Sequence, residues 1–170
     1  YLDCLLRDVE YTGELLRNAD WHIRSLYMGG GTPTTLSSAQ MARLLEAIHT
    51  HFDLSRCLEF TVEGGRPDTL DEEKLRVIYQ GGATRISINP QTMSDRVLRA
   101  VGRRHTAAQT VAAYETARRI GFDDINMDLI AGLPADTAES FADSVRQVTS
   151  MSPSGITVHT LALKKGADLF

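Results

Sequence analysis

Short apolar or β-branched runs alternate along the chain with stretches in which apolar residues recur at helical spacing. Met41, Leu44, Leu45 and Ile48 follow the i, i+3, i+4, i+7 pattern of an amphipathic helix. Five apolar runs predict strands, at residues 23–28, 58–62, 84–88, 125–130 and 156–161. A strand recurring every ~30 residues is typical of βαβ units. The pattern therefore predicts an α/β protein with a parallel sheet, which fits either a doubly wound open sheet or part of a barrel.

Helix boundaries are marked by capping pairs and by glycine. Capping boxes are predicted at Ser37 with Gln40, Thr69 with Glu72 and Thr106 with Gln109, with a weaker signal at Asp136 with Glu139. Glycines at Gly81-Gly82 and Gly121 predict helix ends, because the residue after a helix often needs a left-handed conformation. We find no linker and no internal repeat beyond this βα period.

Composition narrows the function classes. The 170 residues carry a net charge of −4, which gives no support for a nucleic-acid or membrane-surface partner. No apolar run is long enough to span a bilayer. The two cysteines, Cys4 and Cys57, form neither a Cys-x-x-Cys pair nor a disulfide framework, so we expect reduced thiols in a cytoplasmic protein and no metal site in the chain as given.

The first predicted strand runs directly into the loop Gly29-Gly30-Gly31-Thr32-Pro33-Thr34. Glycine has no Cβ, so a ligand can approach the backbone closely and its N–H groups can hold a carboxylate or a phosphate. A glycine-rich loop after a strand can also be purely structural.

Polar residues lie at or near the ends of the later predicted strands: Glu63, Gln91, Asp128 and His159, with Arg103 after a short helical stretch. Taken singly, Glu63 could cap a turn, Gln91 could be a turn residue, His159 a core histidine and Arg103 solvated surface. Asp128 favours function, since burying a carboxylate costs several kcal/mol unless it is paired or used.

Parallel α/β folds bind ligands at the carboxyl ends of their strands, so these residues are expected to share one rim. Such a rim would bind a zwitterionic or polyhydroxylated small molecule, because it combines two carboxylates, an amide, an arginine and a glycine loop.

Six ordered blocks that cover nearly the whole chain give it a family resemblance. The blocks are residues 27–34 (YMGGGTPT), 61–69 (TVEGGRPDT), 85–93 (RISINPQTM), 102–106 (GRRHT), 126–134 (NMDLIAGLP) and 158–165 (VHTLALKK). With them the chain resembles the radical SAM superfamily and, more closely, the oxygen-independent coproporphyrinogen III oxidase (dehydrogenase) family.

The resemblance implies a partial (βα)6 barrel and two cofactors, S-adenosyl-L-methionine (SAM) and a [4Fe–4S] cluster held by three cysteines. In that family an electron cleaves SAM to a 5′-deoxyadenosyl radical, which abstracts hydrogen from the propionates of coproporphyrinogen III. Loss of carbon dioxide and an electron then gives protoporphyrinogen IX for haem biosynthesis. A tetrapyrrole substrate and an electron-donor protein are the partners this implies.

The resemblance also assigns the site residues. Gly29, Gly30 and Thr32 would bind the amino and carboxylate groups of the methionine moiety of SAM. Glu63 would contact the amino group or its surroundings, and Arg103 the carboxylate.

At the other end of SAM, Asp128 would bind the ribose hydroxyls, with Gln91 as a further polar contact. Ile130 and Ala162 would lie against the adenine. The segment Asn89-Pro90-Gln91 departs from the family's usual Gly-x-Gln and so changes the approach to Gln91. No residue of the chain is assigned to catalysis.

A larger departure is the missing Cys-x-x-x-Cys-x-x-Cys motif, which Cys4 and Cys57 do not match. In the family this motif lies upstream of the helix with which the chain opens. We therefore expect residues 1–170 to be one radical SAM core-domain fragment without its first strand, its cysteine loop and its C-terminal region. We expect that fragment to be inactive by itself, and its unpaired sheet edge could support association.

Three functions remain open at this point. The first is a coproporphyrinogen III dehydrogenase, and the second is a haem-binding or haem-delivery protein of the same family. The third, a plain nucleotide-binding module, is disfavoured because the glycine loop lacks both a Lys-Ser/Thr ending and a G-x-G-x-x-G pattern.

Overall fold

The structure, a computed structural model, describes residues 1–162. Its strands form one sheet in which neighbours run parallel and the order along the sheet is the order in the sequence. The strands are Ser25–Met28 (β1), Glu59–Gly65 (β2), Arg85–Gln91 (β3), Asp124–Ala131 (β4) and Gly155–Thr160 (β5).

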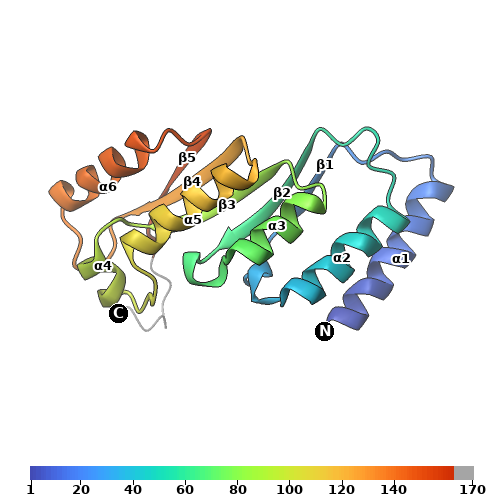
Figure 1. Ribbon diagram of the computed structural model, residues 1–170, viewed down its shortest axis with the longest axis horizontal. Coiled ribbons are helices and arrows are strands. Elements are labelled where there is room, and N and C mark those ends of the chain that lie inside the picture. The colour runs from blue at the N-terminus through green and yellow to red at the C-terminus, as the bar shows by residue number, and fades with distance from the viewer. Residues whose placement is uncertain (163–170) are drawn as a thin grey trace.

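Helices connect these strands, and α1, α2, α3 and α5 lie side by side along the sheet (Figure 1). The α-helices are Leu2–Asn18 (α1), Ser38–His51 (α2), Glu72–Gln80 (α3), Asp95–Ala100 (α4), Ala107–Ile120 (α5) and Ala138–Ser150 (α6), with single 3₁₀ turns at Pro33–Thr35 (η1) and Pro67–Thr69 (η2). A doubly wound sheet reverses its strand order at a switch point, whereas a barrel keeps it. The unbroken order confirms the predicted partial parallel (βα) barrel.

The two faces of the sheet differ in polarity. Val62, Ile86 and Met127 are fully buried on β2, β3 and β4, where they pack in the core beneath the helices. Neighbouring residues along a strand point to the opposite face. Those neighbours are polar: Thr61, Glu63, Arg85, Ser87, Asn126 and Asp128. The helices bury the apolar face and leave the polar face open.

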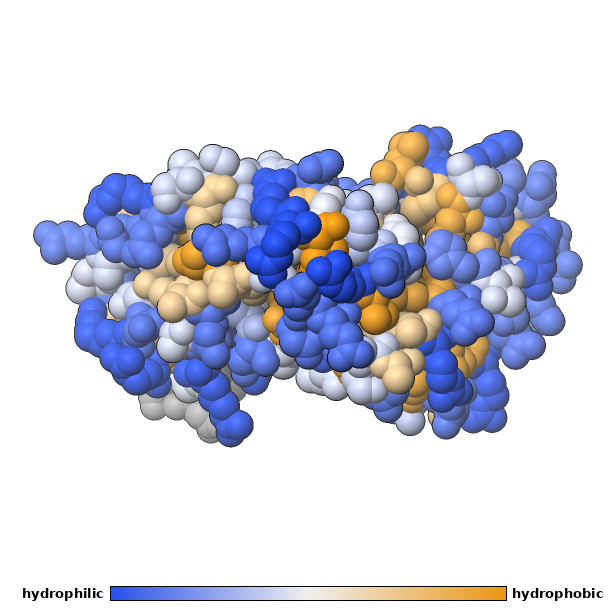
Figure 2. Space-filling view, in the orientation of Figure 1, coloured by the Kyte–Doolittle hydropathy of each residue, from blue (hydrophilic) through white to orange (hydrophobic). Residues whose placement is uncertain are grey.

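The helices are amphipathic, as their spacing predicts. On α3, Leu75 and Ile78 are completely buried, while Arg76 is exposed. The outer surface seen in Figure 2 is accordingly mostly hydrophilic, with apolar side chains showing in patches between polar ones. The apolar seam of these helices thus faces the sheet and the neighbouring helices.

The predicted strands are all present, but their limits differ. β2 continues to Gly65 and β3 to Gln91, so Glu63 and the segment Asn89-Pro90-Gln91 lie within strands rather than after them. The register shifts between Glu63 and Gly65 and again between Ile88 and Gln91. Glycine and proline in these segments predicted strand ends. In the structure both strands continue through these residues, with a β-bulge or similar irregularity where the register shifts.

Two of the predicted capping boxes are confirmed, at Ser37 and Thr106. The pair Thr69 with Glu72 is wrong: α3 is capped by Asp71, whose side chain accepts from the Lys74 backbone N–H, while the Thr69 hydroxyl bonds within the preceding turn. The weaker signal at Asp136 is wrong by one residue, because Thr137 caps α6. Several Ser, Thr and Asp residues compete near each helix start, and local turn geometry decides among them.

Both predicted glycine stops are confirmed, by Gly82 (φ +83°) after α3 and Gly121 (φ +124°) after α5. Among residues 1–162, none of the helices is both long and apolar enough to cross a membrane.

Candidate functional site

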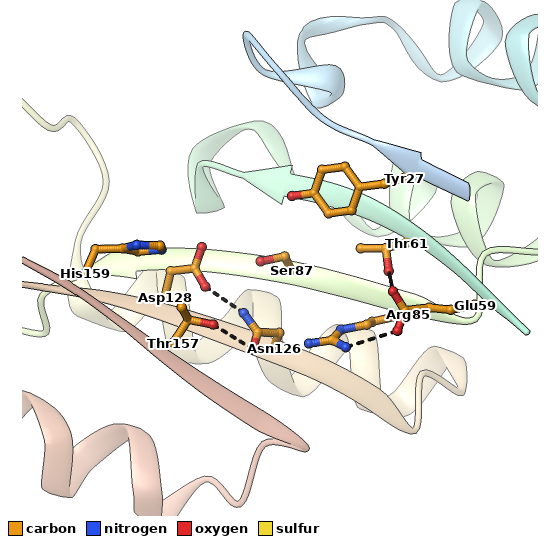
Figure 3. Close-up of a pocket in the computed structure, with 9 residues that line it drawn as sticks. All are labelled: Tyr27, Glu59, Thr61, Arg85, Ser87, Asn126, Asp128, Thr157 and His159. Carbon is orange, nitrogen blue, oxygen red and sulfur yellow. Dashed lines mark hydrogen bonds and ion pairs between the residues drawn. The ribbon is translucent and has the colours of Figure 1, made fainter. Parts of the chain in front are cut away.

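The open face of the sheet carries a polar cavity of about 300 Å³ (Figure 3). Its lining comes from all of the strands: Tyr27 on β1, Glu59 and Thr61 on β2, Arg85 and Ser87 on β3, Asn126 and Asp128 on β4, and Thr157 and His159 on β5. Because alternate residues of parallel strands share one face, these side chains converge on the concave side of the partial barrel.

An ion-pair group closes the amino-terminal end of this face. The Arg85 guanidinium lies 3.2 Å from Glu59 Oε2 (Figure 3). It also lies 3.7 Å from Asp124 Oδ1, so it joins β2, β3 and β4. Thr61 Oγ1 donates to the other Glu59 oxygen at 2.8 Å. These groups satisfy one another and leave the carboxyl-terminal half of the face for a ligand.

Glu63 is the centre of the carboxyl-terminal half. Its Oε2 accepts from the Gly30 backbone N–H at 3.4 Å and from the Tyr27 hydroxyl at 3.5 Å. Its Oε1 accepts from Asn89 Nδ2 at 3.2 Å, and the Ser87 hydroxyl donates to Asn89 Oδ1 at 2.7 Å. One carboxylate thus ties together the ends of β1, β2 and β3.

The glycine loop has one crowded position and two open ones. A Cβ at Gly29 would collide with the Tyr27 ring and lie 2.9 Å from Glu63 Oε2, whereas a Cβ at Gly30 or Gly31 would meet nothing within 4 Å among residues 1–162. Gly30 also has φ +111°, which strongly favours glycine. Gly29 therefore permits the packing of Tyr27 and Glu63, while Gly30 and Gly31 expose backbone to a ligand.

Asp128 belongs to a hydrogen-bonded row on the open face. Asn126 Nδ2 donates to Asp128 Oδ1 at 2.6 Å, and the Thr157 hydroxyl donates to Asn126 Oδ1 at 3.2 Å (Figure 3). The carboxylate is half-buried and keeps its second oxygen free of protein hydrogen bonds within the described residues. Partial burial raises the pKa of the Tyr27 phenol, and the negative charges of Glu63 and Asp128 raise it further, so this phenol stays a donor.

The structure brings together only some of the predicted site residues. Gly29, Gly30 and Glu63 are in contact, and Thr32 stands beside Gly65 of the same rim. Asp128 lies near enough to Tyr27 for its negative charge, like that of Glu63, to raise the pKa of the Tyr27 phenol. The predicted role of each toward SAM stays a prediction.

The remaining predicted residues lie further along the rim. Gln91 ends β3 in a left-handed conformation (φ +68°), and Ile130 is two residues beyond Asp128 on the same face of β4. Ala162 follows β5 and is exposed. Within residues 1–162, the side chains of Gln91 and Arg103 make no hydrogen bond to the other predicted site residues.

Arg103 lies in the turn between α4 and α5 and is half-buried. Burial lowers the pKa of its guanidinium, and the nearby positive charge of Arg66 lowers it further, whereas Asp68 acts in the opposite direction. A guanidinium that is partly desolvated beside another cation favours an anionic partner. This agrees with the carboxylate-binding role that the resemblance implies.

Sequence reasoning missed several groups of the site. Tyr27, Asn89 and Asn126 hydrogen-bond directly to Glu63 or Asp128. They could have been found from the alternation of side chains between the two faces of a strand, since each lies two residues from another polar residue on the same face. The single-residue interpretation of His159 as a core histidine is wrong: its side chain is exposed and lines the cavity.

His105 is almost completely buried and contacts the carboxyl-terminal end of β3. Its Nε2 lies 3.2 Å from the Pro90 carbonyl oxygen, and its Nδ1 has no partner in the described structure. A neutral ring that donates from Nε2 satisfies the Pro90 carbonyl and leaves Nδ1 as an unpaired acceptor within the described residues. Burial lowers the pKa of His105; among the neighbouring charges, Arg103 and Arg66 lower it and Asp68 raises it, and the Pro90 bond also raises it.

We therefore expect the protein to lose stability when the pH falls below the ordinary histidine pKa of about 6.5. The unfolded chain binds a proton at His105 at a higher pH than the folded chain does, so acid favours unfolding in this window. Urea unfolding at about pH 7.5 and about pH 5.5 measures the effect. His105→Gln, which retains a donor but does not titrate, should reduce the difference; an equal difference in both proteins would contradict this role.

The donor set fits SAM. The glycine loop has open space beside Gly30 and Gly31, a guanidinium is present at Arg103, and Asp128 has an oxygen available for hydroxyl groups. The described residues do not fit an iron–sulfur cluster. They contain no group of three His, Cys, Asp or Glu side chains that could hold a metal ion, and Cys57 Sγ bonds to the Glu59 carbonyl.

A parallel (βα) barrel with an open polar face and a glycine loop after its first strand defines the class. Residues 4–148 match the family profile described as "Radical SAM superfamily". The chain belongs to this superfamily, so the predicted recognition is confirmed.

The relatives sharpen this assignment. The chain is 40% identical over 163 residues to the "oxygen-independent coproporphyrinogen-III oxidase-like protein HemZ" of Bacillus subtilis, which covers 95% of the chain and 32% of that relative. It is 33% identical to the "heme chaperone HemW" of the same organism, over 96% of the chain and 43% of the relative. The chain thus spans less than half the length of these relatives.

A solved structure supports the same conclusion. The coproporphyrinogen III oxidase HemN of Escherichia coli, described as a radical SAM enzyme, superposes with a TM-score of 0.86 at 33% identity. The match covers 95% of this chain and 37% of that one. The homologues therefore include coproporphyrinogen III oxidases as well as haem chaperones.

Proposed function

We propose that this chain forms the SAM-binding part of an oxygen-independent coproporphyrinogen III dehydrogenase. The observation that carries the proposal is the convergence of Gly30, Glu63 and Asn89 from consecutive strands, with Asp128 on the next strand. Such a rim offers an accessible glycine backbone, carboxylates and an amide to one zwitterionic, ribose-bearing ligand.

In this proposal each group has a binding task. Gly30 and Thr32 hold the methionine end of SAM, Glu63 accepts from its ammonium group, and Arg103 pairs with its carboxylate. Asp128 accepts from the ribose hydroxyls, and Asn126 holds that carboxylate in place.

Gln91 serves as a further polar contact, while Ile130 and Ala162 lie against the adenine. The reduced [4Fe–4S] cluster, held by cysteines outside the described residues, would supply the electron that cleaves SAM. The polar cavity on the concave face keeps the substrate side of the barrel accessible from the strand ends. We propose a tetrapyrrole as that substrate and a protein as the electron donor.

The test uses the full-length protein with its cluster reconstituted without oxygen. Incubation with SAM, a reductant and coproporphyrinogen III should consume SAM and yield protoporphyrinogen IX, with neither change when one component is omitted. Failure to consume SAM or to form this product would contradict the dehydrogenase function.

The alternative is a haem-binding or haem-delivery protein, favoured by the similarity to HemW. It predicts tight, stoichiometric binding of haem by the full-length protein and no oxidation of coproporphyrinogen III. Titration with haem, followed by its absorption spectrum, separates the two functions.

A further inference from the structure

Lys74 is a buried cation that the proposed binding site does not use. It lies on α3, beneath the rim, and is 8% exposed. Its ammonium group donates to the Thr34 carbonyl at 2.6 Å and to the Thr69 carbonyl at 3.2 Å. Among the described residues no carboxylate lies within ion-pair distance of it.

Burying a charge without an opposite charge is costly, so its hydrogen bonds to neutral carbonyls must be well made. Those carbonyls belong to two different βα connections. Thr34 is in η1, two residues after Thr32 of the glycine loop, and Thr69 is in η2, which follows the strand that carries Glu63. The ammonium group therefore bridges the two loops that form the methionine end of the proposed site.

Thr34 strengthens the same bridge and is completely buried. Its hydroxyl donates to the Gly64 carbonyl at 2.7 Å, and its oxygen lies 2.6 Å from the Thr69 hydroxyl. Gly64 directly follows Glu63 in β2. A Cβ at Gly64 would lie 2.8 Å from the Ser87 carbonyl, so this strand end is also packed tightly against β3.

We propose that Lys74 is a positioning residue for the SAM site: its ammonium group, acting with Thr34, sets the glycine loop against the end of β2. The glycine loop needs such a support because its own contacts are few. Gly30 and Gly31 have open space around them, the bond from the Gly30 N–H to Glu63 is 3.4 Å long, and the Thr32 hydroxyl bonds only to the carbonyl of its neighbour Gly31 among the described residues. Without the bridge, the loop and Glu63 would no longer keep the spacing that one ligand requires.

This inference rests on the proposed function, since it concerns the same ligand. The experiment therefore has a second measurement that needs no ligand. In the full-length protein with its cluster reconstituted, SAM affinity is measured by equilibrium binding, and amide hydrogen exchange of residues 29–34 is followed with no SAM present.

Lys74→Met keeps much of the length of the side chain and removes the donors. We expect it to weaken SAM binding roughly tenfold and to speed exchange in the glycine loop, with exchange in β3 and β4 unchanged. Arg76→Met is the matched control, because it removes an exposed cation from the same helix. It should leave both measurements as in the wild type.

Thr34→Val provides a second route, since valine has nearly the shape of threonine but no hydroxyl. Thr34→Val should reproduce both effects of Lys74→Met. Thr34→Ser keeps the hydroxyl and should leave SAM affinity and loop exchange as in the wild type. The double variant Lys74→Met/Thr34→Val should bind SAM more tightly than the product of the two single losses predicts, since both residues act through one bridge.

The outcomes separate the two proposals. A folded Lys74→Met or Thr34→Val protein with wild-type SAM affinity and wild-type loop exchange would overturn the positioning role. If Lys74→Met does not fold, Thr34→Val and Thr34→Ser decide. If the wild type binds no SAM, the proposed function fails, and faster loop exchange in the variants would still support the bridge.

Discussion

Gly29→Ala is expected to lower the affinity for SAM by on the order of a hundredfold. The added methyl group would collide with the Tyr27 ring and approach Glu63 Oε2 to 2.9 Å. Both side chains must then move, and Glu63 loses its place between Gly30 and Asn89. Equilibrium binding of SAM to the full-length protein measures the loss.

Gly31→Ala is the matched comparison within the same loop. Its methyl group would meet nothing within 4 Å, and the backbone there does not require a positive φ. We expect a much smaller loss of affinity than at Gly29. Equal losses at the two positions would contradict the idea that the crowding of Tyr27 and Glu63 matters. Thermal unfolding of both variants shows whether either has lost stability.

Asp128→Asn is expected to weaken SAM binding by about 2 kcal/mol, or roughly thirtyfold, because a charged acceptor for ribose hydroxyls becomes a neutral one. The fold should tolerate the change. Asn126 Nδ2 can still donate to the oxygen of an amide at this position, and the side chain is only half-buried. SAM affinity and urea unfolding, measured on the same preparation, separate binding from stability.

Asp123→Asn controls for the loss of one negative charge near β4. Asp123 is exposed just before that strand, and among residues 1–162 its side chain makes no hydrogen bond, while its backbone carbonyl accepts from Arg118 and Ser154. It should bind SAM like the wild type. Unchanged affinity in Asp128→Asn would remove Asp128 from the binding site, whatever the control shows.

Local patterns in the sequence were sufficient to predict an α/β protein with a parallel sheet, whereas the choice of a partial barrel came from the family resemblance. Helical spacing such as that of Met41, Leu44 and Ile48 and the apolar runs of the strands record which face each element buries, and burial of apolar area is the dominant force of folding. Ser37 and Thr106 cap their helices as predicted because a capping box depends on residues three apart. The site residues near strand ends could be found in the same way, since parallel strands bring their carboxyl ends to one rim.

The contacts among those residues could not be predicted, because they depend on register. Glu63 accepts from Tyr27, Gly30 and Asn89 only because β2 pairs with β1 and β3 in one alignment and shifts by a residue between Glu63 and Gly65. Glycine and proline in these segments suggested strand ends. Pairing with neighbouring strands instead extends β2 to Gly65 and β3 to Gln91.

What the sequence by itself determined is the fold class, the order of its elements and the rim on which the site lies, since each follows from short-range periodicity and from glycine's conformational freedom. Only the tertiary structure decided which polar groups meet. Lys74 illustrates the difference: in the sequence it is one charged residue of an amphipathic helix, yet it is buried against the carbonyls of Thr34 and Thr69. Its partners come from another βα unit and an adjoining turn, and packing of α3 beneath the rim brings them together.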